Sequence, residues 1–197
     1  MPACLRQVTD QDILPDAVFA RERKARRAAL MASKRLRRVA LGPDCTLYFE
    51  SYETMLFQIQ EMLLTEKGGP AQLADELAAY NPLIPRGREL VATVMFEIDE
   101  PRRREAVLGR LGGVEAGFFL KIGEERVSGE PEGDAERTRA DGKTSSVHFL
   151  RFPLSDAQAA LFRDPATAVI AGCDHPLYDH LAVLSGETRA ELALDLA

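Results

Sequence analysis

Residues that could carry chemistry gather near the C-terminal end of the chain. Positions 173–180 read Cys-Asp-His-Pro-Leu-Tyr-Asp-His and hold two of the three histidines. Thiolate, imidazole and carboxylate groups are ligands of zinc and iron, so this stretch is a candidate site for a divalent metal ion. The candidate ligands are Cys173, Asp174, His175 and His180. Their spacing matches no standard zinc motif, and a turn organised around Pro176 is the alternative interpretation.

A thiol nucleophile is a second chemical hypothesis for this region. Cys173 follows an apolar predicted strand, and His175 or the third histidine, His148, could act as its base. Because a thiolate beside an imidazolium is activated, a metal- or thiol-dependent enzyme using His148, Cys173, His175 and His180 is one candidate function. An inert, buried thiol is the competing interpretation, since free cysteine is among the most buried residue types. Three cysteines are too few to hold an iron–sulphur cluster within one chain.

The stretch from Tyr52 to Glu66 predicts a helix with apolar residues on two sides. Such a helix is packed on both sides, so its polar residues need partners, because an unpaired buried polar group costs about 1–3 kcal/mol. We predict a polar pocket between this helix and the histidine-containing C-terminal segment. Its candidate residues are Glu50, Gln58, Gln60, Glu61, His148 and Arg151. The competing interpretation is a structural network in which these groups pair with arginines.

The patterns of apolar residues and turns predict an α+β fold. Strands are expected at 39–41, 45–51, 89–98, 116–122, 125–127, 144–152 and 166–173, and helices at about 15–37, 52–66, 71–80, 101–111, 157–162 and from about 186. Because turns separate most of the strands, we expect a mostly antiparallel sheet covered by helices. The length of 197 residues suits a single domain over 1–197.

The N-terminal helix, from about 15 to 37, is strongly basic. Nine lysines or arginines and one glutamate lie between Arg21 and Arg38, although the whole chain has a net charge of -6. Nucleic-acid binding through phosphate contacts is therefore a further alternative function. The lack of interleaved aromatic residues favours instead a solvated face, or one that complements the acidic region from Glu124 to Glu136 of its own or a neighbouring subunit. A flexible acidic loop is predicted at about 130–142. Nucleic acid is accordingly not the expected partner.

The composition, with 46% hydrophobic and 28% charged residues, is typical of a globular protein. Since no secretory signal and no apolar run of roughly 18 residues are apparent, we expect a cytoplasmic protein without a membrane anchor. Motifs of dinucleotide-binding proteins, nucleoside triphosphatases, serine hydrolases and zincins are absent. The Ala-rich stripe of the first helix and the two-sided second helix predict a homodimer, because two-fold pairs are the commonest assemblies.

A set of short motifs resembles a known family. They are Arg38-Val39 with Gly42-Pro43, Phe49-Glu50, Gln58-Ile59-Gln60-Glu61-Met62, Tyr80-Asn81-Pro82-Leu83, Val147-His148-Phe149-Leu150-Arg151-Phe152, and Asp174-His175-Pro176 with Tyr178. From about Arg35 onward the chain resembles a bacterial family, the domain of unknown function 3501. The resemblance transfers no catalytic residues. Because genes of that family often lie near those of rubrerythrin and of iron–sulphur proteins related to heterodisulphide reductase, it implies a link to redox or peroxide metabolism. Our leading hypothesis is a binding or accessory component with protein partners in a redox system.

Overall fold

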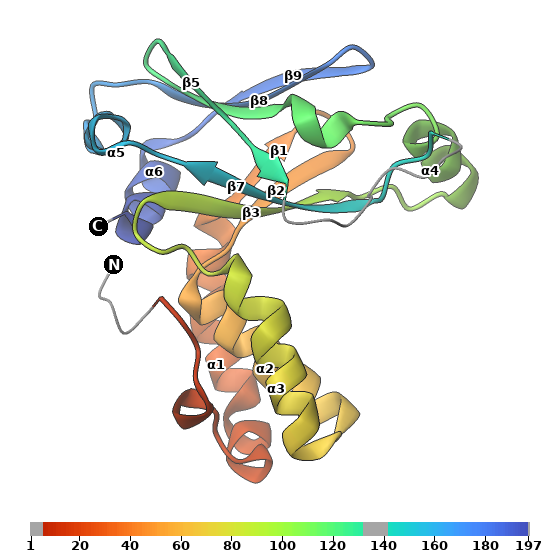
Figure 1. Ribbon diagram of the computed structural model, residues 1–197, viewed down its shortest axis with the longest axis vertical. Helices are drawn as coiled ribbons and strands as arrows, with labels where there is room; N and C mark the ends of the chain where they lie inside the picture. The colour runs from red at the N-terminus through yellow and green to blue at the C-terminus, as the bar shows by residue number, and fades with distance from the viewer. Residues whose placement is uncertain (1–5, 132–141, 197) are drawn as a thin grey trace.

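The structure, a computed structural model, describes residues 6–131 and 142–196 (Figure 1). Two antiparallel sheets are stacked face to face, and a layer of three helices extends away from them on one side. The predicted α+β class is confirmed, but the strands form two sheets and not one. The predicted acidic loop at 130–142 lies almost entirely over 132–141, which are outside the described residues.

The larger sheet has five strands in the order β1-β2-β3-β7-β6, and every neighbouring pair is antiparallel. The strands are β1 (Arg38–Leu41), β2 (Cys45–Phe49), β3 (Glu89–Phe96), β6 (Glu130–Pro131) and β7 (Val147–Pro153). Successive side chains of a strand point to opposite faces. On β3, Leu90, Ala92 and Val94 therefore face the smaller sheet, whereas Val91 and Thr93 face the helices.

The smaller sheet has four strands in the order β5-β4-β8-β9, again all antiparallel. They are β4 (Phe118–Ile122), β5 (Glu125–Ser128), β8 (Val169–His175) and β9 (Tyr178–Val183). The predicted hairpin at 116–127 is present. The sequence pattern does not predict β9, because its solvent-facing residues Leu181 and Val183 are apolar and the alternation typical of a surface strand is missing.

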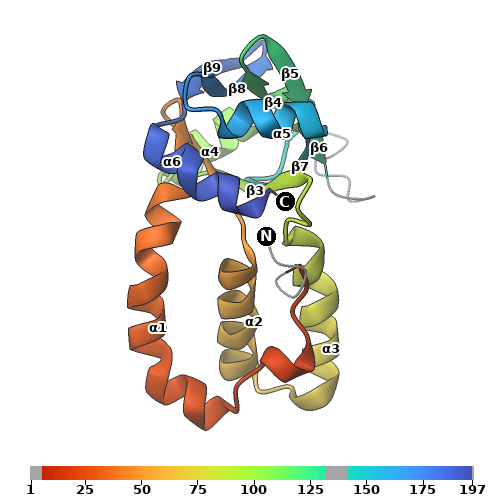
Figure 2. The same ribbon diagram turned by 90° about the vertical axis from the view of Figure 1, so that its left-hand side faces the viewer.

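The main hydrophobic core fills the space between the two sheets. Leu47, Leu150 and Phe152 of the larger sheet are fully buried there against Phe118 and Leu120 of the smaller one. Three short helices add apolar residues at the margins of this core (Figures 1 and 2). They are α4 (Pro101–Leu108), α5 (Asp156–Arg163) and α6 (Gly186–Leu192).

The helical layer consists of α1 (Asp16–Leu36), α2 (Tyr52–Glu66) and α3 (Gly69–Tyr80), with α2 in the middle (Figure 2). It forms a second core in which Met55 and Ile59 of α2 pack with Val91 on the outer face of β3. The basic N-terminal helix predicted at about 15–37 is α1. Within the described residues, none of the helices combines the length and the apolar character that crossing a membrane requires.

Helix α2 has the bounds that the sequence predicts. Ser51 Oγ accepts a hydrogen bond from Thr54 N–H at 3.3 Å, and Thr54 Oγ1 accepts one from Ser51 N–H at 2.9 Å, which together cap the first turn. One apolar side, centred on Ile59, is buried. On the other side Phe57 is half-buried, and its ring meets Phe19 of α1 edge-on with centroids 5.6 Å apart. The helix is therefore packed on both sides, but unequally.

Candidate ligand-binding pocket

The residues predicted as metal ligands lie on the β8–β9 hairpin but do not converge. The Asp174 carboxylate forms an ion pair with Arg126 of β5 at 2.8 Å. The Nδ1 atom of His175 accepts a hydrogen bond from the N–H of Leu177 at 3.2 Å, within the turn of the hairpin. Cys173 is fully buried. In the part of the chain that the structure describes, no group of three or more His, Cys, Asp or Glu side chains is arranged to hold a metal ion.

His180 has a packing role on β9. Its ring lies edge-on to that of Tyr178, with centroids 4.5 Å apart, and against Gly42, where an added Cβ atom would come within 2.5 Å of the imidazole. Gly42 has a φ of +72°, a left-handed conformation that favours glycine. The Tyr178 hydroxyl donates a hydrogen bond to the Leu41 carbonyl at 2.7 Å. These contacts join the two sheets at one margin of the sandwich, and they explain His180 without a metal.

Both cysteines that the structure describes are buried thiols. Burial raises the pKa of Cys173 to about 11, and it raises the pKa of Cys45 as well. A cysteine nucleophile requires a lowered pKa and access to its substrate, and Cys173 has neither. The arrangement supports the interpretation of Cys173 as an inert, buried thiol.

His148 faces away from the helical layer. It lies on β7 directly opposite Val94, so its side chain points into the space between the sheets. Its Nε2 atom is 2.9 Å from the Ser145 carbonyl oxygen. Glu50 lies on the other face of the same sheet, because its carboxylate accepts a hydrogen bond from Thr93 at 2.6 Å. The larger sheet therefore separates His148 from the other predicted pocket residues, and the structure does not bring them into one site.

The polar residues around the start and middle of α2 are engaged inside the helical layer. Glu50 also accepts a hydrogen bond from Thr54 Oγ1 at 2.7 Å. The side-chain amide of Gln60 bonds the backbone of Leu14 twice, accepting from its N–H at 3.0 Å and donating to its carbonyl at 3.2 Å. Gln58 is half-buried on α2. Gln60 thus anchors the N-terminal segment to α2, as its predicted need for a partner requires.

The two remaining predicted pocket residues pair with charged or backbone groups. Glu61 forms a two-pronged ion pair with Arg23 of α1, with N···O distances of 2.6 and 2.5 Å. Arg151 donates to the Pro82 carbonyl at 2.6 Å and pairs with Glu89. These contacts match the competing interpretation, in which the polar residues form a structural network with arginines.

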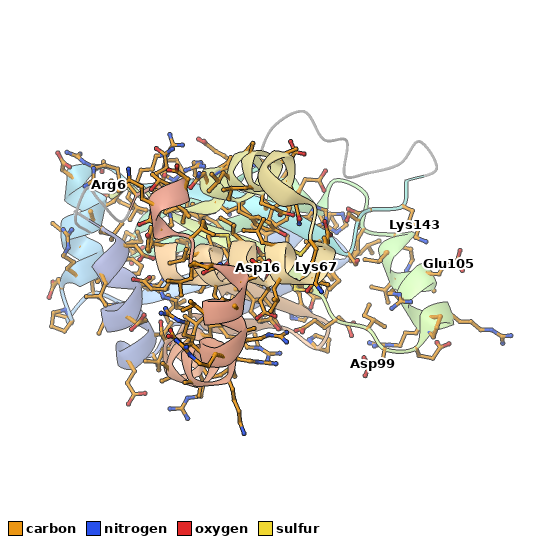
Figure 3. All side chains as sticks on the ribbon, turned by 90° about the horizontal axis from the view of Figure 1, so that it is seen from below. Arg6, Asp16, Lys67, Asp99, Glu105 and Lys143 are labelled. Carbon is orange, nitrogen blue, oxygen red and sulfur yellow. The ribbon has the colours of Figure 1, made fainter. Side chains whose placement is uncertain are left out.

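The basic side chains of α1 are partly engaged within the molecule. Besides the pair between Arg23 and Glu61, Arg26 pairs with Glu22 one turn earlier at 2.8 Å. Figure 3 views the molecule from the end of the helical layer remote from the sheets, where Asp16 and Lys67 lie, and nitrogen-tipped side chains fan out from α1 toward solvent. Most of the basic side chains of α1 are therefore exposed to solvent.

A pocket of about 810 Å³ opens between α1, α2 and the C-terminal end of the chain. The 3-10 helix η5 (Ala193–Asp195), which follows α6, contributes to it. The lining residues are Asp12 and Leu14 from the N-terminal segment, Phe19, Arg26, Ala29, Leu30, Ser33 and Arg37 from α1 and its C-cap, Glu53, Leu56, Phe57 and Gln60 from α2, and Glu191, Leu194 and Asp195 from α6 and η5. Of the six predicted pocket residues, Gln60 alone lines this one.

A buried ion-pair network forms the end of the pocket nearest the sheets. The Arg37 guanidinium binds both carboxylate oxygens of Asp195, at 2.7 and 2.9 Å, and a Glu191 oxygen at 2.9 Å. Arg37 is 4% exposed and Asp195 is 2% exposed. Burial raises the pKa of Asp195 despite this pairing. Burial acts in the same sense on Glu191, but hydrogen bonds from Ser33 and Arg37 outweigh it and lower the pKa of that carboxyl.

Farther from the sheets the pocket walls are apolar. Leu30 of α1 faces Leu56 and Phe57 of α2 across the pocket, and the small Ala29 leaves space between the helices. Among the described charged residues of the lining, only Glu53 has neither a hydrogen bond nor an ion pair. An apolar pocket with a few polar groups is the usual form of a small-molecule site. The apolar residues on the second side of α2 were the signal in the sequence for this pocket. Only the tertiary structure places α1 and the C-terminal residues opposite them.

Comparisons with known proteins agree with the resemblance seen in the motifs. The model of the family described as "Protein of unknown function (DUF3501)" matches residues 7–196. A crystal structure of a novel protein of unknown function from Burkholderia pseudomallei K96243 shares 37% sequence identity, covers 97% of this chain and 100% of its own, and superposes with a TM-score of 0.89. No curated protein matches the chain. Because the family model covers nearly its whole length, this chain belongs to the DUF3501 family.

Proposed function

We propose that this protein is a binding component, and that its ligand occupies the pocket between α1 and α2. The observation that carries the proposal is the 810 Å³ volume between apolar walls and a fully paired, buried ion network. A cavity of this size matches the usual range for small-molecule sites, about 300–1,000 Å³. The walls suit a ligand with an apolar body, and the carboxylate of Glu53 suits a hydrogen-bond donor or a cationic group on that ligand.

A binding role agrees with the way in which the polar groups are used. Arg37, Asp195 and Glu191 satisfy one another, so they shape the pocket and leave little capacity for proton transfer. Gln60 holds the N-terminal segment in place and is likewise engaged. Recognition by shape and apolar contact is therefore the chemistry that this pocket is best suited to perform.

Binding of N-phenyl-1-naphthylamine tests the proposal. This fluorophore has an apolar body and an N–H donor, and its emission increases in apolar surroundings. We expect saturable binding to the wild type and an affinity at least about tenfold lower in Ala29→Trp, because the indole would fill the pocket. Ala25→Trp is the matched control, since Ala25 is exposed on the same helix and lies outside the pocket lining.

The outcome of that comparison is decisive. Loss of binding in Ala29→Trp with retention in Ala25→Trp supports the pocket as the site. Equal binding by both variants would place the probe elsewhere and overturn the assignment of the site. If the wild type shows no saturable binding, the idea of a ligand with an apolar body is wrong.

An accessory role in redox or peroxide metabolism, with protein partners there, is the wider context of this proposal. It is supported by the gene neighbourhood that the family resemblance implies. In that context the protein would supply binding and not thiol chemistry, because both described cysteines are buried and their pKa values are raised. A homodimeric state belongs to the same proposal.

A further inference from the structure

Three of the four edge strands of the two described sheets are protected against pairing with another strand. β1 presents Arg38 to solvent, β5 presents Glu125 and Arg126, and β6 has only two residues and ends in Pro131. Charged side chains, prolines and short strands are the usual ways in which proteins prevent edge-to-edge association. These three edges are therefore unsuited to docking a further strand.

β9, the fourth edge strand, has the opposite character. Its solvent-facing residues Leu181 and Val183 are 64% and 74% exposed, and Leu177 in the preceding turn is 60% exposed. The side chain of Leu181 leans across Gly172 toward Phe119, since a Cβ atom at Gly172 would lie within 2.8 Å of both. An apolar strip formed by Leu181 and Val183 thus runs along the β9 edge on the outer face of the smaller sheet, whereas Phe119 is buried beneath the guanidinium of Arg126. Exposed apolar strips that reach a sheet edge are sites of association.

The backbone of β9 also has groups available for pairing. The N–H of Leu184 donates to the Val169 carbonyl of β8 at 2.9 Å, so the backbone polar groups of Leu184 point toward β8. In an antiparallel pair this direction alternates along the strand. The N–H and C=O groups of Asp179, Leu181 and Val183 therefore point away from β8, toward the open edge, and among the described strands β9 pairs with β8 alone.

We infer that two copies of this protein pair along β9, antiparallel and edge to edge, so that their smaller sheets join into one continuous sheet. A two-fold axis through Leu181 uses all three outward-pointing residues, because it sets Leu181 opposite Leu181 and Asp179 opposite Val183. No like charges oppose each other in this register. A second copy is the partner that the edge fits, because a two-fold axis makes the same donors, acceptors and apolar side chains complementary to themselves.

This seam is independent of the ligand pocket. The smaller sheet lies on the far side of the larger sheet from the helical layer, as Figures 1 and 2 show. The homodimer predicted from the sequence used the Ala-rich stripe of α1 and the two-sided α2, which both belong to the helical layer. The proposed dimer therefore leaves the pocket between α1 and α2 accessible in each copy.

Sedimentation equilibrium of the full chain tests the inference. We expect the wild type to be dimeric at concentrations well above about 1 µM, and Leu181→Lys to be monomeric, because two ammonium groups would face each other across the seam. Met31→Lys is the matched control, since Met31 is 53% exposed on α1 and lies outside both the seam and the pocket lining. A monomeric wild type, or a dimer that survives Leu181→Lys, would overturn the inference.

Oxidative cross-linking tests the register. In the proposed pairing the two Leu181 Cα atoms lie about 5.5 Å apart, within the roughly 4.4–6.8 Å that a disulfide spans. The two Val183 Cα atoms lie more than about 13 Å apart, since they are separated by four residues along the strand. Leu181→Cys should therefore form a covalent dimer much faster than Val183→Cys or the wild type. Equal rates in the two variants would contradict pairing about Leu181.

Discussion

Replacing Arg37 with methionine should destabilise this protein more than replacing any exposed arginine of α1. Arg37 lies at the end of α1, yet its guanidinium binds Asp195 and Glu191 close to the C-terminus and donates to the Glu50 carbonyl at 3.1 Å. The variant would leave the Asp195 carboxylate, 2% exposed, without its bidentate partner. A contact that joins the end of α1 to η5 would be replaced by a buried, uncompensated charge.

The magnitude follows from the burial of the pair. Removing one member of a buried ion pair costs about 3–5 kcal/mol, because the other charge stays desolvated. The pair between Arg23 of α1 and Glu61 of α2 is the matched control, since its side chains are 46% and 21% exposed. Pairs that are largely in contact with solvent contribute little to stability, so Arg23→Met should destabilise the protein much less than Arg37→Met.

Urea unfolding followed by circular dichroism at pH 7 provides the measurement. The double variant Arg37→Met with Asp195→Leu should regain most of the lost free energy of unfolding, because it removes both charges. An Arg37→Met variant as stable as Arg23→Met, or a double variant no more stable than Arg37→Met alone, would contradict a stabilising role of the buried ion pair.

The pH dependence gives a second readout on the same variant. Burial already raises the pKa of Asp195 above its usual value of 3.8 in the native state, and loss of Arg37 should raise this pKa further. A carboxyl whose pKa is higher in the folded state binds its proton more readily there than in the unfolded state. The deficit of Arg37→Met should therefore be largest at neutral pH and should shrink as acid protonates Asp195. A deficit that grows on acidification would contradict this account.

Two further predictions concern α2 and the thiols. Ile59→Ala should lower the free energy of unfolding by about 2–5 kcal/mol, because Ile59 is fully buried. Leu64→Ala, on the half-buried side of α2, should lower it by about 1 kcal/mol or less. Equal losses in urea unfolding would show that both sides of the helix are equally packed. Burial raises the pKa of Cys173 to about 11, so this thiol should resist iodoacetamide at pH 8 in the native state and react only after unfolding. Rapid labelling of the native protein, located at Cys173 by mass spectrometry, would contradict the assignment of Cys173 as an inert thiol.

Local chemistry explains what could be predicted from the sequence. The bounds of α2 follow from the apolar spacing and from the Ser51 and Thr54 cap, because a helix is determined by residues three and four positions apart. The β4–β5 hairpin follows equally from its short turn. The need of Gln60 for a partner was also predictable, but its partner, Leu14, lies 46 residues away.

The features that only the tertiary structure decided are contacts between residues far apart in the sequence. Side chains alternate between the two faces of a strand, and His148 points to one face of the larger sheet while Glu50 lies on the other. The sheet therefore separates two residues that were predicted to line one pocket. The ligand pocket needs α1, α2 and Asp195, and the contact between Arg37 and Asp195 spans 158 residues. No local pattern specifies such a contact, because it is set by the packing of whole elements. For the same reason β9 became recognisable as a strand only through its pairing with β8.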